Sequence, residues 1–196
     1  SDKSPDPGLA SALVGGKHFV TPGSHRLASS HLLLPAAEDP RLVVPLASKT
    51  MSLSGLSMWR PSSKAGRAVH RAAQVAVKSG LLRHLPGPRL RLLLPKTTAT
   101  QPSVLQSLSE AQLGHSPHAW AAAAGSRGPF QKVAIQLFDA QGEVLAHVKA
   151  GRRGLPGARI DHEAKALAAI AACRFSSMRL PQRLGHGSCD DWHALF

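Results

Sequence analysis

Residues 132–151 read KVAIQLFDAQGEVLAHVKAG, and this stretch determines the type of fold that the chain can adopt. Val133, Ile135 and Leu137 occur at every second position, which is the period of a half-buried strand. A turn at residues 140–143 follows, and its glycine supplies the positive φ that a tight reversal commonly needs. Residues 144–150 then return as a second strand. We therefore predict an antiparallel hairpin.

The segments on either side extend this hairpin into an α+β fold. Residues 119–124 read as a strand of small side chains, and the Gly- and Pro-containing segment 125–129 ends it. After a loop at residues 152–157, apolar residues recur at intervals of three and four from Ile160 to about Cys173, which predicts a helix. The expected fold is thus a small N-terminal α+β extension followed by an antiparallel sheet with one packed helix.

Lys149 is a cation near the end of a strand that otherwise reads as core. Glu163 lies on the edge of the apolar stripe of the following helix, three residues after Ile160 and four before Leu167. An unpaired buried charge costs several kcal/mol, so an acid in this place needs a cationic partner. Lys149 is the nearest candidate along the chain, and we expect the two to pair at the sheet–helix junction. In the alternative interpretation, Lys149 extends to solvent and Glu163 is an ordinary first-turn residue.

With the hairpin, the lysine and the helical glutamate in this order, residues 114–196 resemble the smaller, N-terminal lobe of the protein-kinase-like fold, in its aminoglycoside-phosphotransferase branch. The resemblance implies that LPQRLGHG (180–187) is the next strand and turn, and that DWHALF (191–196) is the strand leading to a hinge. It also implies a nucleotide-binding site. The residues implied in cofactor binding are Lys149, Glu163 and the phosphate-covering loop Gly125, Ser126, Arg127 and Gly128.

In the resembled fold a second lobe completes catalysis. It supplies a His-x-Asp loop with a downstream Asn, and a further Asp that holds magnesium. This sequence contains no Asn, and its only acids after Glu163 are Asp190 and Asp191. We therefore expect an N-terminal fragment of a phosphotransferase-like protein that is inactive alone, with ATP and Mg²⁺ as cofactors of the complete protein only. The alternative is a half-lobe that has been retained for binding or assembly. The apolar segment 191–196 would then contact a C-terminal lobe or a partner chain.

The charge of the chain favours polyanionic partners. Lys and Arg number 24 against 11 Asp and Glu, which gives a net charge of +13. Residues 64–78 read as a helix with a basic side, which is either a solvated face or a contact for nucleic acid or a membrane. Two alternative functions therefore stand beside the first. One is a non-enzymatic basic module that binds nucleic acid or a ribonucleoprotein, and the other is a scaffold that docks through its apolar C-terminal strand.

Domain boundaries and compartment follow from composition. We predict a flexible arm at residues 1–28, the α+β extension at 29–113 and the kinase-like lobe at 114–196. The sequence lacks an apolar run long enough to span a membrane, and it has two cysteines, which fits a cytoplasmic protein. Cys173, His186, Cys189 and His193 lie within 21 residues. They lack paired Cys-x2-Cys ligands, so we favour incidental residues over a zinc site.

Overall fold

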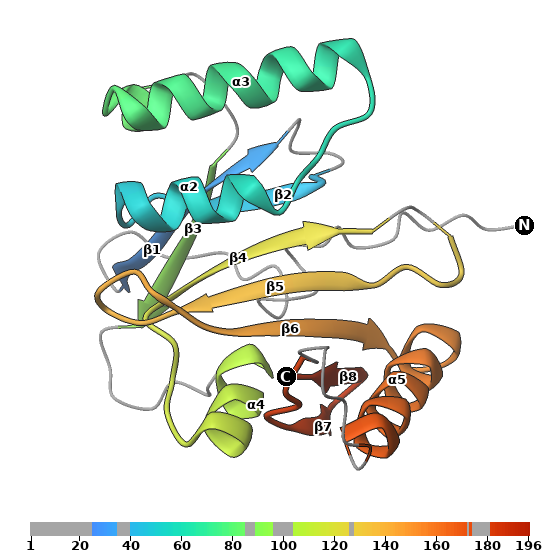
Figure 1. Cartoon of the computed structure of the whole chain (residues 1–196). Coiled ribbons are helices and arrows are strands. Elements are labelled where there is room, and N and C mark those ends of the chain that lie inside the picture. The colour runs from blue at the N-terminus through green and yellow to red at the C-terminus, as the bar shows by residue number, and fades with distance from the viewer. Residues whose placement is uncertain are drawn as a thin grey trace, which may run out of the picture.

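The structure is a computed structural model that describes residues 25–34, 40–84, 89–95, 104–125, 128–171, 173 and 181–196. In these residues one antiparallel sheet of eight strands runs through the molecule in the order β3-β1-β2-β4-β5-β6-β8-β7 (Figure 1). Helices pack on both of its faces, so the α+β class predicted from the sequence is confirmed. In this part of the chain every helix is too short or too polar to cross a lipid bilayer.

The strands and helices alternate irregularly along the chain. The strands are β1 (His25–Leu34), β2 (Leu42–Pro45), β3 (Arg89–Pro95), β4 (Ala119–Ala124), β5 (Val133–Phe138), β6 (Val144–Arg152), β7 (His186–Cys189) and β8 (Trp192–Leu195). The helices are α2 (Lys49–Ser57), α3 (Lys64–Lys78), α4 (Val104–Leu113) and α5 (Leu155–Ala171), with a 3-10 turn η1 (Leu81–His84).

The predicted hairpin is confirmed as β5 and β6. The two strands pair antiparallel from Val133 opposite Ala150 to Leu137 opposite Ala146, and a register shift follows before Phe138. Gly142 has a φ of 91°, which is the left-handed conformation expected at this turn. β4 pairs antiparallel with the other edge of β5. The three strands predicted from residues 119–150 are therefore present.

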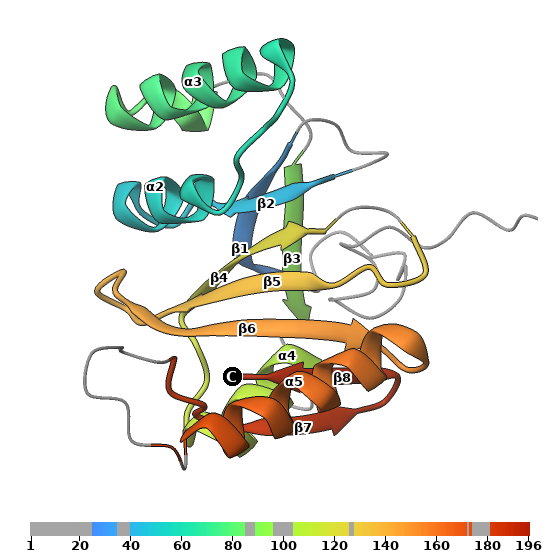
Figure 2. The ribbon, with the colours of Figure 1, turned by 45° about the vertical axis from the view of Figure 1, so that its right-hand side comes forward.

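Helices α2, α3 and α5 cover one face of the sheet, and α4 covers the other. Near β1 and β2, Leu56 of α2 and Val77 of α3 pack with Leu42 and other buried residues. At the opposite end, Ile160 of α5 packs on Leu195 of β8. Leu105 and Leu108 of α4 belong to the core on the reverse face. Figures 1 and 2 show α3 as the outermost element at one end and α4, α5 and β7 at the other.

The sheet continues across the boundary predicted at residue 113. Leu42 of β2 pairs with Ala123 of β4, so the segments 29–113 and 114–196 contribute to one sheet, and their division into domains stays a prediction. β1 begins at His25, so the last residues of the predicted arm 1–28 are a strand, and residues 1–24 lie outside the described residues.

Close packing of α2 on the sheet depends on Gly55. A Cβ atom at this position would stand 2.9 Å from Cβ of Ala121 and 3.3 Å from Cδ of Pro45. We expect Gly55→Val to lower the free energy of unfolding by about 1–3 kcal/mol, because the helix must move away from β4. Urea denaturation measures this loss. Ser57→Val, at an exposed position of the same helix, is the control, and an equal loss in both variants would contradict the packing argument.

Candidate functional site

Lys149 lies on the face of the sheet that α5 covers. It pairs across the strands with Leu195, so the two side chains point to the same side of the sheet, and Leu195 packs against Ile160 and Ala164 of α5. Its neighbours Val148 and Ala150 point to the opposite face and are buried. Side chains therefore alternate between the two faces at this end of the strand, and Lys149 itself is 54% exposed and is not part of the core.

Helix α5 places Glu163 beside this lysine. The helix begins at Leu155, which corrects the predicted start at Ile160 and removes part of the predicted loop at 152–157. Pro156 explains the earlier start, because proline is well tolerated in the first turn of a helix. The buried residues Ile160 and Ala164 anchor the helix, and they leave Glu163 at the edge of the junction with 28% of its side chain exposed.

The carboxylate of Glu163 binds two ammonium groups. Lys149 Nζ donates a hydrogen bond to Oε1, as predicted from the sequence. Lys132 Nζ donates to Oε2 at 3.2 Å. Burial raises the pKa of Glu163, but the hydrogen bonds and charges of the two lysines lower it by more, so its pKa lies below the ordinary value. At neutral pH one anion therefore holds two cations, and the cluster keeps a net positive charge.

Lys132 was missed in the sequence, although a signal for it exists. It directly precedes β5, where Ala134 pairs with Lys149 across the hairpin. Alternation along the strand therefore places Lys132 and Lys149 on one face, once the register of the hairpin is known. That register depends on the turn, which sequence periodicity does not define to a single residue.

The base of the predicted phosphate-covering loop lies next to the backbone of Lys132. Ser126 and Arg127 lie outside the described residues, but Gly125 N–H donates to the carbonyl of Lys132 at 2.8 Å and so closes the base of the loop beside the lysine. A Cβ at Gly125 would stand 3.0 Å from that carbonyl oxygen.

A second contact links the segment before β5 to helix α5. The ring of Phe130 lies 4.1 Å from the guanidinium of Arg159, which is one turn before Glu163 on the same helix.

A second polar cluster links α5 to β7 and β8. Asp161 Oδ1 lies 2.8 Å from His186 Nε2 and 2.9 Å from His193 Nδ1. Burial raises the pKa of Asp161, but hydrogen bonds from the two histidines outweigh it and lower the pKa. These histidines belonged to the zinc set considered above, and both cysteines of that set are free. In the described ranges no three or more His, Cys, Asp or Glu side chains are placed to hold a metal ion.

The C-terminal segment 191–196 is inside the sheet and not at its edge. β8 pairs with β6 on one side and β7 on the other, and Trp192, Leu195 and Phe196 are buried. The segment is therefore not an exposed apolar edge, and its contact with a C-terminal lobe or a partner chain stays a prediction. The covering strand is β7, whose first two residues are the last two of the predicted strand and turn at 180–187. A scaffold that docks through residues 191–196 would have to unpair this strand first.

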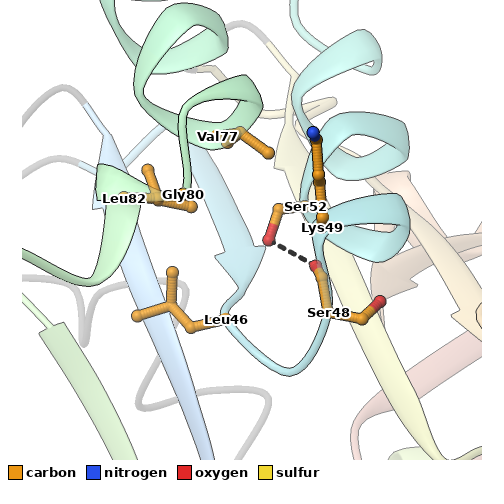
Figure 3. A pocket seen from close by; sticks show the side chains of 7 residues that line it. All are labelled: Leu46, Ser48, Lys49, Ser52, Val77, Gly80 and Leu82. Atoms are coloured by element: carbon orange, nitrogen blue, oxygen red, sulfur yellow. Dashed lines mark hydrogen bonds between the residues drawn. The ribbon is translucent and has the colours of Figure 1, made fainter.

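A pocket of about 340 Å³ lies at the other end of the molecule, between α2 and the end of α3 (Figure 3). Its polar groups already have partners within the protein. Ser52 Oγ donates to the carbonyls of Pro45 and Ser48, and Lys49 Nζ donates to the carbonyl of Lys78 at 2.9 Å. We therefore take these groups as stabilising the α2–α3 layer and do not assign them a ligand.

Comparisons of the chain with models of protein families, with curated proteins and with solved structures found no match. Function must therefore be inferred from the side chains themselves. Of the groups described above, the cluster of Glu163, Lys149 and Lys132 combines accessible cations with a neighbouring glycine-containing loop. We take it as the candidate functional site.

Proposed function

We propose that residues 114–196 form the phosphate-binding lobe of a phosphotransferase-like protein with a kinase fold. The observation that carries this proposal is the contact between Lys149 of β6 and Glu163 of α5. In protein kinases a lysine on the third strand pairs with a glutamate of the following helix, and the lysine contacts the nucleotide phosphates. Here the pair joins elements of the same type in the same order.

The arrangement of the surrounding elements supports the same function. Along the chain, strand β4, the glycine-containing segment 125–132, the hairpin β5–β6, helix α5 and strands β7 and β8 follow one another. This is the order that the resemblance to the smaller kinase lobe implies. Gly125 also ties the base of the loop to Lys132, so a phosphate bound by the lysines would lie next to the loop.

The chemistry of the cluster fits a nucleotide phosphate group. Each ammonium has three N–H donors, and the contacts with Glu163 use one donor of each lysine. The remaining donors and the net positive charge suit phosphate oxygens, which form strong charge-assisted hydrogen bonds. ATP is the expected ligand of the complete site. No magnesium ligand is assigned, because the described acids are not grouped in a way that suits a cation.

Residues for the chemical step are not assigned to this chain. Its sequence has no Asn and no His-x-Asp order, so the deprotonation of an acceptor hydroxyl has no candidate base of the kinase type. We therefore propose that this chain binds and orients phosphates, and that transfer requires residues from elsewhere. The acceptor would then be determined by those other residues.

Removal of the Lys149 ammonium tests the proposal. We expect Lys149→Met to weaken ATP binding by about tenfold to a hundredfold, because a hydrogen bond to a charged group contributes about 1.5–3 kcal/mol. Folding should change little, since half of the side chain is exposed. Isothermal titration calorimetry measures the affinity, and urea denaturation measures the stability.

The matched control is Lys165→Met, an exposed lysine on the same helix as Glu163. It removes the same charge from the chain but leaves the cluster intact, so ATP binding should stay within about twofold of the wild type. Equal affinity in the wild type and Lys149→Met would exclude Lys149 from the site. An equal loss of ATP affinity in both lysine variants would mean that ATP responds only to the overall charge of the protein.

A further inference from the structure

The positive charge of the chain is concentrated in one segment. Residues 41–109 contain eleven Lys and Arg and no Asp or Glu, whereas residues 110–196 contain ten Lys and Arg and seven Asp and Glu. Helices α2 and α3 belong to the first segment and α5 to the second. In both views α2 and α3 lie at one end of the molecule and α5 lies at the other (Figures 1 and 2). The molecule is therefore polarised, with its most basic end at α3.

The exposed side of α3 is divided lengthwise into a basic and an apolar half. Arg67, Arg71 and Lys78 recur at intervals of four and seven residues and so follow one line along the helix. The flank next to this line carries exposed alanines and Val75, which is 65% exposed. Leu81, just beyond the helix, is 56% exposed. The buried side, by contrast, consists of Ala73, Ala76 and Val77.

The basic side chains of α3 are available to a partner. Among the described residues no carboxylate forms an ion pair with Lys64, Arg71 or Lys78. Arg67 donates to the carbonyl of Ser62, which holds it close to the helix start. At the other end, Lys49 donates to the backbone carbonyl of Lys78 and adds a further cation at the C-terminal end of α3.

We propose that this surface, formed by the exposed side of α3 and by Leu81, binds peripherally to an anionic lipid bilayer. A helix that is basic on one side and apolar on the other lies in the plane of the interface, with its apolar side chains at the acyl boundary and its cations near lipid phosphates. The charge asymmetry of the molecule turns α3 toward such a surface and the acidic residues of the other end away from it.

The exposed apolar residues favour a lipid surface over nucleic acid. A contact with single-stranded nucleic acid uses cations for the phosphates and aromatic rings for the bases, and helix α3 contains no Phe, Trp or Tyr. Val75 and Leu81 gain nothing from a phosphate backbone, but they lose contact with water when they enter a bilayer interface. The proposal concerns α3 and does not depend on the function proposed for Lys149 and Glu163.

Co-sedimentation of the full chain with lipid vesicles tests the proposal. We expect binding to vesicles that contain phosphatidylglycerol and little binding to vesicles of phosphatidylcholine alone. The double variant Arg71→Glu, Lys78→Glu should weaken binding by more than about twenty-five-fold, because each cation near an anionic bilayer contributes about fivefold. Val75→Ser should weaken it by a few-fold without a change in charge.

The control is the double variant Arg153→Glu, Lys165→Glu, which makes the same charge change at exposed positions near α5. It should bind the anionic vesicles several-fold more tightly than the α3 double variant. Equal loss in the two double variants, or an unchanged affinity in Val75→Ser, would overturn the assignment to a lipid-binding face of α3. Tighter binding to single-stranded RNA than to the anionic vesicles at the same salt would assign the surface to nucleic acid instead.

Discussion

Acidification from about pH 6.5 to about pH 4 is expected to destabilise the protein by about 3 kcal/mol through His31 alone. This side chain of β1 is fully buried. Its ring stacks on Trp120 with the centroids 4.4 Å apart, and its Nε2 lies 3.1 Å from the Trp120 carbonyl oxygen. Burial lowers the pKa of His31 from 6.5 to about 4, and the hydrogen bond to Trp120 offsets only part of this.

The sign of the effect follows from which state binds the proton. Between the two pKa values the unfolded chain protonates His31 and the folded protein does not, so the free energy of unfolding falls as the pH falls. Below about pH 4 the folded protein binds the proton as well, and this contribution levels off. The Nδ1 atom has no hydrogen-bond partner in the described structure, so the buried site offers the imidazolium no second acceptor.

Urea denaturation at a series of pH values measures this contribution. His31→Phe retains a ring against Trp120 but removes the titration, so its free energy of unfolding should depend less on pH between about 4 and 6.5 than that of the wild type. At each pH the difference in free energy of unfolding between the wild type and His31→Phe is free of the contributions from other titrating groups, because these are the same in both proteins. Parallel pH profiles for the two proteins would contradict this account, because they would mean that the pKa of His31 does not change on folding.

Ile160→Ala is expected to lower the free energy of unfolding by about 2–5 kcal/mol. Ile160 is fully buried and packs with Ala164 and Leu195, and this small cluster attaches α5 to the sheet. The deletion leaves a cavity, and the small side chain of Ala164 cannot fill it. Because the same helix carries Glu163, the variant should also bind ATP more weakly under conditions in which it remains folded.

Ile170→Ala is the matched control, since it makes the same deletion on the same helix at a side chain that is 37% exposed. It should cost less than about 1 kcal/mol. Urea denaturation of the two variants gives both values directly. Similar losses would mean that α5 is not attached through Ile160, and the position of Glu163 beside β6 would then need another explanation.

Local patterns predicted the part of the fold that carries the candidate site. The β5–β6 hairpin could be predicted because alternation and the turn glycine are both contained in twenty consecutive residues. The contact of Lys149 with Glu163 could be predicted because a short connection joins β6 to α5. In both cases the interacting residues are close in sequence, so few arrangements compete.

Long-range pairing could not be predicted in the same way. β1 pairs with β3, and β2 pairs with β4 some eighty residues later, which no local periodicity indicates. The burial of His31 follows from this pairing, as does the internal position of β8 between β6 and β7. The second lysine of the site, Lys132, was missed because it depends on the register of the hairpin.

The side-chain ¹⁵N resonances of the lysines, recorded by NMR while ATP is added, test the central claim most directly. If Lys149 and Lys132 bind phosphate beside Glu163, their Nζ signals should shift together along one saturation curve, while that of Lys165 stays in place. In Glu163→Gln, which no longer holds the two ammonium groups, the curve should move to higher ATP concentrations. Shifts at other lysines with none at Lys149 would contradict the proposed phosphate site.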